Sequence, residues 1–154
     1  MRNIYLDNSA TTRIKDEAPK EYIDISTSLY GNPSSLHLMG LEAERALNKA
    51  RTEILATMDA KECQLIFTSS GSEANNLAII GRALSKERFR HGSKIITTDG
   101  EHASVREPLE RLRTMGYNIV YIPTRGGEID FDILERELTG DVILVTMMMV
   151  NNET

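Results

Sequence analysis

Hydrophobic and polar residues follow two different periods along this chain. Up to about residue 60 the apolar positions recur at helical spacing and predict helices at Asp16–Ser26 and Leu36–Met58. One apolar stripe runs along the longer helix, at Ala43, Leu47, Ala50, Ile54 and Met58. The charged residues between these positions are typical of a solvated face.

From residue 64 onward, short apolar runs alternate with helical stretches. The runs predict strands at Leu65–Thr68, Lys94–Thr98, Asn118–Ile122 and Val142–Met148. The stretches between them predict helices at Glu73–Leu84, Ser104–Met115 and Phe131–Leu138. This alternation indicates an α/β fold with a mostly parallel sheet. The nearly continuous apolar run Val142–Val150 further predicts a strand that is covered on both faces.

Several residues mark the ends of these elements. Gly116 and Gly140 stand where C-terminal caps are expected, and Asp130 stands where an N-cap is expected. Pro19 falls in the first turn of its helix, where a missing N–H does little harm. Pro108 is expected to start its helix or to kink it.

Two polar stretches separate the elements of the first part. Asp7–Thr12 follows the short extended candidate Ile4–Leu6 and predicts a loop or turn. Tyr30–Ser35 predicts a break between helices, because Pro33 holds the preceding Asn32 in an extended conformation.

The segment Phe67–Asn76 combines an apolar run, a turn of small residues and a helix start. Ser70 and Glu73 fit a capping box, which places the helix N-terminus at the turn. Free N–H groups and the helix dipole favour an anion there, and Gly71 allows close approach of a phosphate. An ordinary capped helix start explains the same residues, and the turn matches neither the Walker pattern nor G-x-G-x-x-G.

Ligands of open α/β sheets bind beyond the carboxyl ends of the strands. That rule selects three polar segments, Ser69–Ser72, Asp99–His102 and Asn151–Thr154. His102 thus stands where a ligand is expected, although a lone histidine is more often a helix cap or a structural group. The asparagines that follow the last strand cap the next element or contact a ligand, because burying them unpaired is costly.

Composition narrows the class of protein. The 154 residues suit one domain, and 40% hydrophobic with 27% charged content is typical of a soluble globular chain. A net charge of −5 provides no footprint for nucleic acid or for an anionic membrane, and no apolar run reaches the length of a membrane span. We also expect no signal peptide and no metal site. The single cysteine, Cys63, fits a reducing, cytoplasmic location.

Five motifs together resemble the amino-terminal part of the NifS/IscS-type cysteine desulfurases, in family order and with family spacing. They are YLDNSATT at Tyr5–Thr12, GNPSSLH at Gly31–His37, FTSSGSEANN at Phe67–Asn76, EH at Glu101-His102, and VNNET at Val150–Thr154. The resemblance covers essentially the whole chain.

The resemblance implies a function that the pattern alone does not. The family are pyridoxal 5'-phosphate (PLP) enzymes of the aspartate-aminotransferase fold (fold type I), and this chain would form part of the large domain. They convert L-cysteine to L-alanine and leave a persulfide on an enzyme cysteine. The sulfur goes to an acceptor or scaffold protein for iron–sulfur clusters and thio-cofactors. Members are homodimers, so we expect a homodimer of the intact enzyme.

The resemblance also assigns residues. The family residues that hold the cofactor phosphate correspond to Gly71 and Ser72. This sequence reads SSGSE where many relatives have SGATE or SGGTE, so Ser72 replaces a threonine and keeps its hydroxyl. The histidine that stacks over the cofactor ring and assists proton transfer falls on His102. The asparagine near the ring and the substrate falls on Asn152. The family motifs also contain Asn8, Asn32 and His37, to which we give no individual role.

Other family residues have no counterpart here. The Schiff-base lysine in its Ser-x-His-Lys setting, the aspartate of the pyridinium nitrogen, the persulfide cysteine and the small C-terminal domain would all lie beyond Thr154. Cys63 precedes the first large-domain strand and is interpreted as a structural or semi-exposed thiol. The lysines, which do not match that setting, are Lys15, Lys20, Lys49, Lys61, Lys86 and Lys94.

We therefore expect an N-terminal fragment of a desulfurase that is inactive alone. In this expectation, residues 1–60 form an N-terminal segment with the long helix, and residues 61–154 form the first part of the PLP-binding large domain. A non-catalytic fragment or assembly subunit is one alternative. A selenocysteine lyase or another class V aminotransferase is a second.

Overall fold

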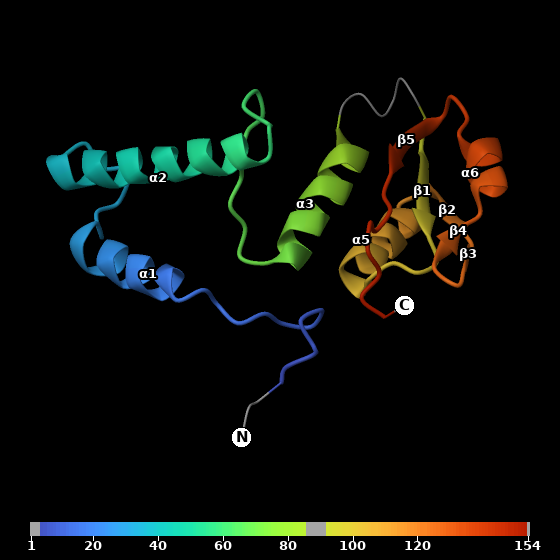
Figure 1. The fold of residues 1–154 in the computed structure, drawn as a ribbon. Coiled ribbons are helices and arrows are strands. Elements are labelled where there is room, and N and C mark those ends of the chain that lie inside the picture. Colours follow the sequence, from blue (N-terminus) through green and yellow to red (C-terminus); the bar gives the residue numbers. More distant parts are fainter. Residues whose placement is uncertain (1–3, 86–91, 154) are drawn as a thin grey trace. The chain divides into compact units, whose positions relative to one another are not determined.

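A computed structural model describes residues 4–85 and 92–153 (Figure 1). The chain divides into two compact units, Met1–Phe67 and Thr68–Thr154. The expected division after residue 60 stays a prediction about domain organisation. Within the described ranges, no helix combines the length and the apolar character that crossing a membrane requires.

The first unit holds the two predicted helices, α1 (Glu17–Ser28) and α2 (Leu38–Thr57). Pro19 lies in the first turn of α1, as expected. The N-cap of α2 is His37, whose Nδ1 accepts a hydrogen bond from the Gly40 backbone N–H at 3.3 Å. Histidine is an uncommon cap, which is why the sequence pattern began this helix two residues early.

The loop between α1 and α2 is a tight turn. The Asn32 side-chain oxygen accepts from the Ser34 N–H at 2.9 Å, and its carbonyl accepts from the Ser35 N–H at 2.9 Å. A Cβ atom on Gly31 would collide with the Met39 carbonyl, so only glycine fits there. The predicted break between the helices is therefore confirmed.

The polar stretch near the N-terminus is also a turn. The Ala10 and Thr11 N–H groups donate to the Asp7 carbonyl at 3.2 and 3.3 Å. The extended candidate Ile4–Leu6 has no strand partner among the described residues.

The second unit contains a parallel sheet in the order β2-β1-β5. Its strands are β1 (Lys94–Thr98), β2 (Asn118–Ile122) and β5 (Val142–Val145). Its helices are α3 (Gly71–Leu84), α5 (Ala103–Thr114) and α6 (Phe131–Glu137). The α3 and α5 helices lie side by side on one face of the sheet, and α6 lies on the other face (Figure 1). The predicted α/β fold with a mostly parallel sheet is therefore confirmed.

Apolar side chains from α3, α5 and the strands form the core of this unit, including Ala83, Ile95, Leu109 and Leu112, all fully buried. Pro108 lies inside α5 and is buried, so it does not start the helix. Burial of these side chains on one face fixes the two helices against the sheet.

One buried hydrogen bond in this core supports a stability prediction. The Tyr117 hydroxyl donates to the Ala83 carbonyl at 2.6 Å, and Tyr117 is 3% exposed. We expect Tyr117→Phe to lower the free energy of unfolding by about 1–2 kcal/mol, because a buried carbonyl loses its donor. Tyr121→Phe is the control, since its half-buried hydroxyl donates to Glu110 at 2.8 Å and water can replace it. Equal losses in chemical denaturation of the two variants would contradict the assignment.

Two strand predictions were wrong. The segment Leu65–Thr68 forms no strand, and Ile66 and Phe67 are 64% and 51% exposed. An apolar run becomes a strand only when a neighbour completes its hydrogen bonds, and none of the described strands pairs with it. The last strand ends at Val145 instead of Met148.

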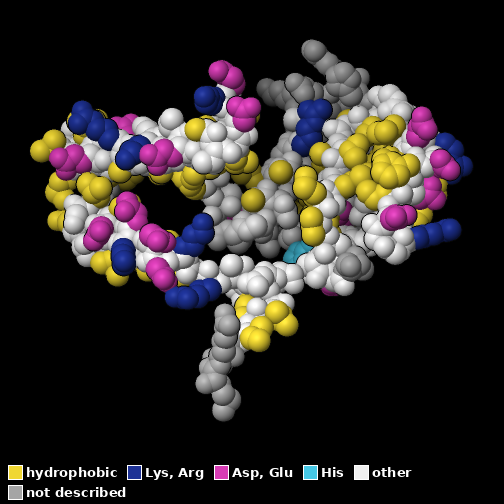
Figure 2. All heavy atoms as spheres, in the orientation of Figure 1, with side chains coloured by type: hydrophobic (Ala, Val, Ile, Leu, Met, Phe, Trp, Pro, Cys, Tyr) yellow, Lys and Arg dark blue, Asp and Glu magenta, His cyan; other side chains and the backbone are white. Residues whose placement is uncertain are grey.

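The expectation that Val142–Val150 is covered on both faces was also wrong. β5 pairs only with β1 among the described strands, and beyond it Thr146 still donates to the Ile96 carbonyl at 2.9 Å before the strand pairing ends. Val145, Met149 and Val150 are 43%, 98% and 79% exposed. Figure 2 shows hydrophobic side chains open to solvent over β5.

The end of α6 differs from the prediction too. The C-cap of α6 is Leu138, so Gly140 is not the cap. The φ of Gly140 is also not positive. Lys94 satisfies this helix end instead, donating to the Glu137 carbonyl at 3.3 Å and to the Thr139 hydroxyl at 2.8 Å.

The other predicted caps are confirmed. Gly116, with a φ of 91°, follows α5, and the Asp130 carboxylate accepts from the Ile133 N–H at 3.0 Å.

A short hairpin was not predicted from the sequence. It joins β3 (Thr124–Arg125) to β4 (Glu128–Ile129). Gly126 and Gly127 form the turn with φ values of 62° and 87°, as the favoured two-residue hairpin turn requires. The Gly-Gly pair between two short β-prone pieces was the signal that could have revealed it.

Candidate functional site

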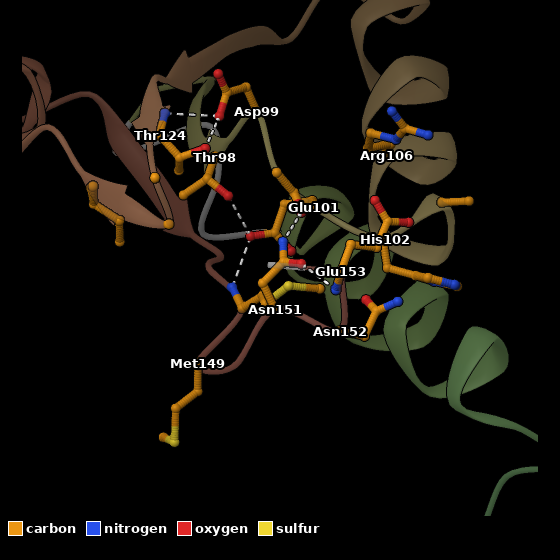
Figure 3. A pocket seen from close by; sticks show the side chains of 16 residues that line it. Thr98, Asp99, Glu101, His102, Arg106, Thr124, Met149, Asn151, Asn152 and Glu153 are labelled. Atoms are coloured by element: carbon orange, nitrogen blue, oxygen red, sulfur yellow. Dashed lines mark hydrogen bonds between the residues drawn. The ribbon is translucent and has the colours of Figure 1, made fainter. Parts of the chain in front are cut away.

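A pocket of about 540 Å³ lies beyond the carboxyl end of β1 (Figure 3). Three stretches of the second unit line it: residues 98–103 with Arg106, the β3–β4 hairpin, and residues 148–153. Two of the three expected segments, Asp99–His102 and the described part of Asn151–Thr154, therefore meet here, while Thr154 lies outside the described residues. The third, Ser69–Ser72, does not contribute to the lining.

A buried glutamate connects two of these stretches. Glu101 is 6% exposed, and its Oε1 accepts from the Thr98 hydroxyl and from the Met148 backbone N–H, each at 2.8 Å. Both hydrogen bonds are charge-assisted, which makes them stronger than neutral ones. Glu101 therefore fixes the chain after β5 against the end of β1 (Figure 3).

Two further side chains fix the pocket walls. The Asp99 carboxylate accepts from the Thr124 N–H at 2.9 Å and from its hydroxyl at 2.6 Å, which ties the hairpin to the end of β1. The Asn151 amide donates to the Gly100 carbonyl at 3.0 Å. Asn151 is thus half-buried and paired within the protein, whereas its neighbour Asn152 is exposed on the pocket wall.

His102 stands at the start of α5 as its N-cap and lines the pocket. Its Nδ1 accepts from the Ser104 backbone N–H at 3.1 Å and lies 2.9 Å from the Ser104 hydroxyl. Because Nδ1 is an acceptor, the neutral ring carries its proton on Nε2. The exposed imidazole is therefore oriented by the helix it caps.

The N-terminus of α3 is a second polar site. Ser70 caps it, accepting from the Glu73 N–H at 3.2 Å, so the predicted helix start at this turn is confirmed. The Glu73 carboxylate turns back to Ser69, accepting from its N–H at 2.6 Å and its hydroxyl at 2.7 Å. The Ser69 hydroxyl, followed by its N–H, lowers the pKa of Glu73, so this carboxylate is ionised at neutral pH.

The same turn leaves room for an anion. Gly71 and Ser72 are exposed, and a Cβ atom on Gly71 would meet no atom within 4 Å. Their N–H groups make no hydrogen bond to another described residue. These are the groups that bind phosphate at a helix N-terminus. The ionised Glu73 opposes an anion, and its two bonds to Ser69 partly satisfy its charge.

The remaining candidates belong to the first unit or carry no site. Asn32 and His37 shape the turn and the cap described above, and Asn8 accepts a 3.3 Å bond from Thr12 through its carbonyl. Cys63 is an exposed free thiol. Lys86 lies outside the described residues. Sequence reasoning missed Arg106 and Thr124 in the pocket. Arg106 lies one helical turn after His102, a spacing that could have revealed it, whereas only the fold brings Thr124 to the end of β1.

Comparison with known proteins identifies the family. Residues 4–154 match the class V aminotransferase family, so the chain belongs to that family. It is 42% identical over 155 residues to a cysteine desulfurase of Trichormus azollae, which covers 100% of this chain and 38% of the relative. It is 40% identical over 153 residues to the cysteine desulfurase IscS of Dictyoglomus turgidum, with 99% and 38% covered.

Solved structures agree with the sequence comparison. A NifS-like protein has a TM-score of 0.89 at 33% identity and covers 99% of this chain and 42% of its own. SspA in complex with cysteine has a TM-score of 0.84 at 29% identity, with 97% and 43% covered. The resemblance to NifS/IscS-type desulfurases is thus confirmed, and the chain spans about two fifths of the length of the relatives it matches.

Proposed function

We propose that this chain forms the cofactor-cradling part of a PLP-dependent cysteine desulfurase, which converts L-cysteine to L-alanine and passes the sulfur on as a persulfide. The observation that carries the proposal is the joint presence, in one unit, of a pocket at the end of β1 and of a helix N-terminus with two N–H groups that no described residue accepts from. The desulfurase relatives, and the cysteine bound in the SspA structure, support the substrate.

The residues fit the cofactor. The Gly71 and Ser72 N–H groups would hold the phosphate together with the Ser72 hydroxyl, since that turn is open and has donors to spare. His102 would cover one face of the ring, and Asn152 would contact the ring or the substrate. When bound, the cofactor supplies the electron sink that makes the reaction feasible. The neutral His102 ring would donate a hydrogen bond from its Nε2–H, and the imidazolium form would release its proton at this nitrogen.

We also propose a homodimer, a cytoplasmic location, and an acceptor or scaffold protein that takes the sulfur for iron–sulfur clusters and thio-cofactors. The single exposed thiol fits a reducing location. The family resemblance supports the other two.

A non-catalytic assembly subunit is the second candidate. The two candidates differ in one spectrum, measured on the protein isolated from its own cells through an N-terminal tag. A desulfurase shows the absorbance band of protein-bound PLP, and borohydride bleaches it. A non-catalytic subunit shows no such band. Comparing the rates with L-selenocysteine and L-cysteine as substrates then distinguishes a selenocysteine lyase from a cysteine desulfurase.

Ser72→Ala tests the phosphate assignment in the same isolated protein. We expect PLP affinity to fall about 10- to 150-fold, because a hydrogen bond to a charged group contributes about 1.5–3 kcal/mol. Ser72→Thr retains the hydroxyl and should bind PLP as the parent does. Pyridoxal, which lacks the phosphate, should bind parent and Ser72→Ala equally in equilibrium dialysis. Unchanged PLP affinity in Ser72→Ala would contradict the assignment.

A further inference from the structure

A chain of hydrogen bonds connects α3 to His102. The Asn75 side-chain amide nitrogen donates to the Ser104 hydroxyl oxygen at 2.9 Å, across 29 residues of sequence. The Ser104 hydroxyl lies 2.9 Å from His102 Nδ1. Asn75 and Ser104 are both half-buried, between two helices that pack together. No family motif assigned a role to either side chain.

The donors fix the direction of this chain. The amide nitrogen of Asn75 can only donate, so the Ser104 oxygen accepts there. The Ser104 oxygen has a second lone pair, so this bond alone does not set its role toward His102. That role follows from His102 Nδ1, which accepts from the Ser104 backbone N–H at 3.1 Å, so the Ser104 hydroxyl can only donate to it. Two donors from one residue thus converge on a single ring nitrogen. The imidazole is left with its proton on Nε2 and with a restricted ring angle.

The position of Asn75 gives this chain a second consequence. Asn75 lies three residues after Ser72 on α3, and therefore one turn from the proposed phosphate cradle. A displacement of the first turn of α3 would move the amide that orients Ser104.

We propose that Asn75 and Ser104 are positioning residues that hold His102 in the Nε2–H tautomer and couple its ring to the first turn of α3. The catalytic meaning of this arrangement rests on the proposed function, whereas the tautomer and the coupling do not. The chemistry is the same as in metal and catalytic sites where the partner of one ring nitrogen fixes the role of the other.

The test is nitrogen NMR of the protein labelled with ¹⁵N-histidine, with no cofactor or substrate added. Signals of His102 are assigned with His102→Asn. His37 serves as an internal reference, since it caps α2 through Nδ1 but is followed two positions later by Met39, which has no hydroxyl. We expect His102 to show the Nε2–H tautomer alone. Ser104→Ala and Asn75→Ala should shift its Nδ1 resonance toward the average of two tautomers.

Two variants control the experiment. Ser104→Thr retains the hydroxyl and should restore the parent spectrum. Asn76→Ala removes the neighbouring amide, which bonds within its own helix to the Ser72 carbonyl at 2.8 Å, and should leave His102 unchanged. An Nδ1–H tautomer in the parent would overturn the proposal, as would unchanged His102 signals in Ser104→Ala. If Asn75→Ala does not fold, the pair Ser104→Ala and Ser104→Thr still decides.

The outcome is separable from that of the proposed function. If the tautomer is as expected but no desulfurase activity exists, only the proposed function fails. If activity exists, Ser104→Ala should lower kcat while PLP affinity stays that of the parent. If the enzyme is active but neither Ser104→Ala nor Asn75→Ala changes its His102 signals, the proposed function stands and the positioning role is contradicted.

Discussion

Glu101→Ala is expected to lower the free energy of unfolding of the second unit by about 3 kcal/mol. The substitution removes a buried carboxylate and leaves the Thr98 hydroxyl and the Met148 N–H without their acceptor. Each buried donor left unpaired costs about 1–3 kcal/mol. Urea denaturation of the whole protein, followed by far-UV circular dichroism, measures the loss. The chain after β5 should also exchange its amide hydrogens faster, because Met148 is its anchor.

Glu101→Gln is the matched control. Its amide oxygen can still accept from both donors, so the expected loss is smaller, about 1 kcal/mol for the missing charge assistance. Equal losses for the two variants would show that the carboxylate acts through its charge and not through these two bonds. A fully stable Glu101→Ala would contradict the anchoring role altogether.

His102→Ala is expected to lower kcat of the proposed desulfurase reaction at least about 10²-fold, the usual contribution of a positioned acid or base. PLP affinity should change far less than it does in Ser72→Ala, because the phosphate contacts are elsewhere. His102 is also the N-cap of α5, and losing a cap costs about 1 kcal/mol of stability. Alanine alone therefore mixes two effects.

His102→Asn separates them. Asparagine is a good N-cap, so it should restore stability while leaving kcat as low as in alanine. Alanine formation from L-cysteine and thermal unfolding are measured on both variants. Recovery of kcat by asparagine would show that capping, and not the imidazole, is what the reaction needs.

The sequence predicted two strands of the second unit well and its other apolar runs poorly. The bounds of β1 and β2 agree with the prediction, because β-branched runs with helices after them are strong signals. Apolar residues encode the tendency to extend, but a strand also needs a neighbour, and the described residues supply none for Leu65–Thr68. β5 ends early for another reason, because the Met148 N–H donates to the Glu101 carboxylate and not to a strand.

The site shows a similar division. His102 and Asn152 were located by the rule that ligands bind beyond strand ends, and both line the pocket. Their roles toward the cofactor stay predictions. The hydrogen bond between Glu101 and Met148 was not predictable, because it joins residues 47 positions apart. The same holds for Asn75 and Ser104, since only the packing of α3 on α5 brings them together.

The decisive measurement is the alanine released from L-cysteine by the protein isolated from its own cells through an N-terminal tag, with PLP and a thiol reductant present. We expect many alanine molecules per protein molecule, and a loss of that release in His102→Asn. Stoichiometric PLP binding without alanine would contradict the desulfurase proposal and leave another class V aminotransferase reaction. A protein that binds no PLP and releases no alanine would favour the non-catalytic subunit.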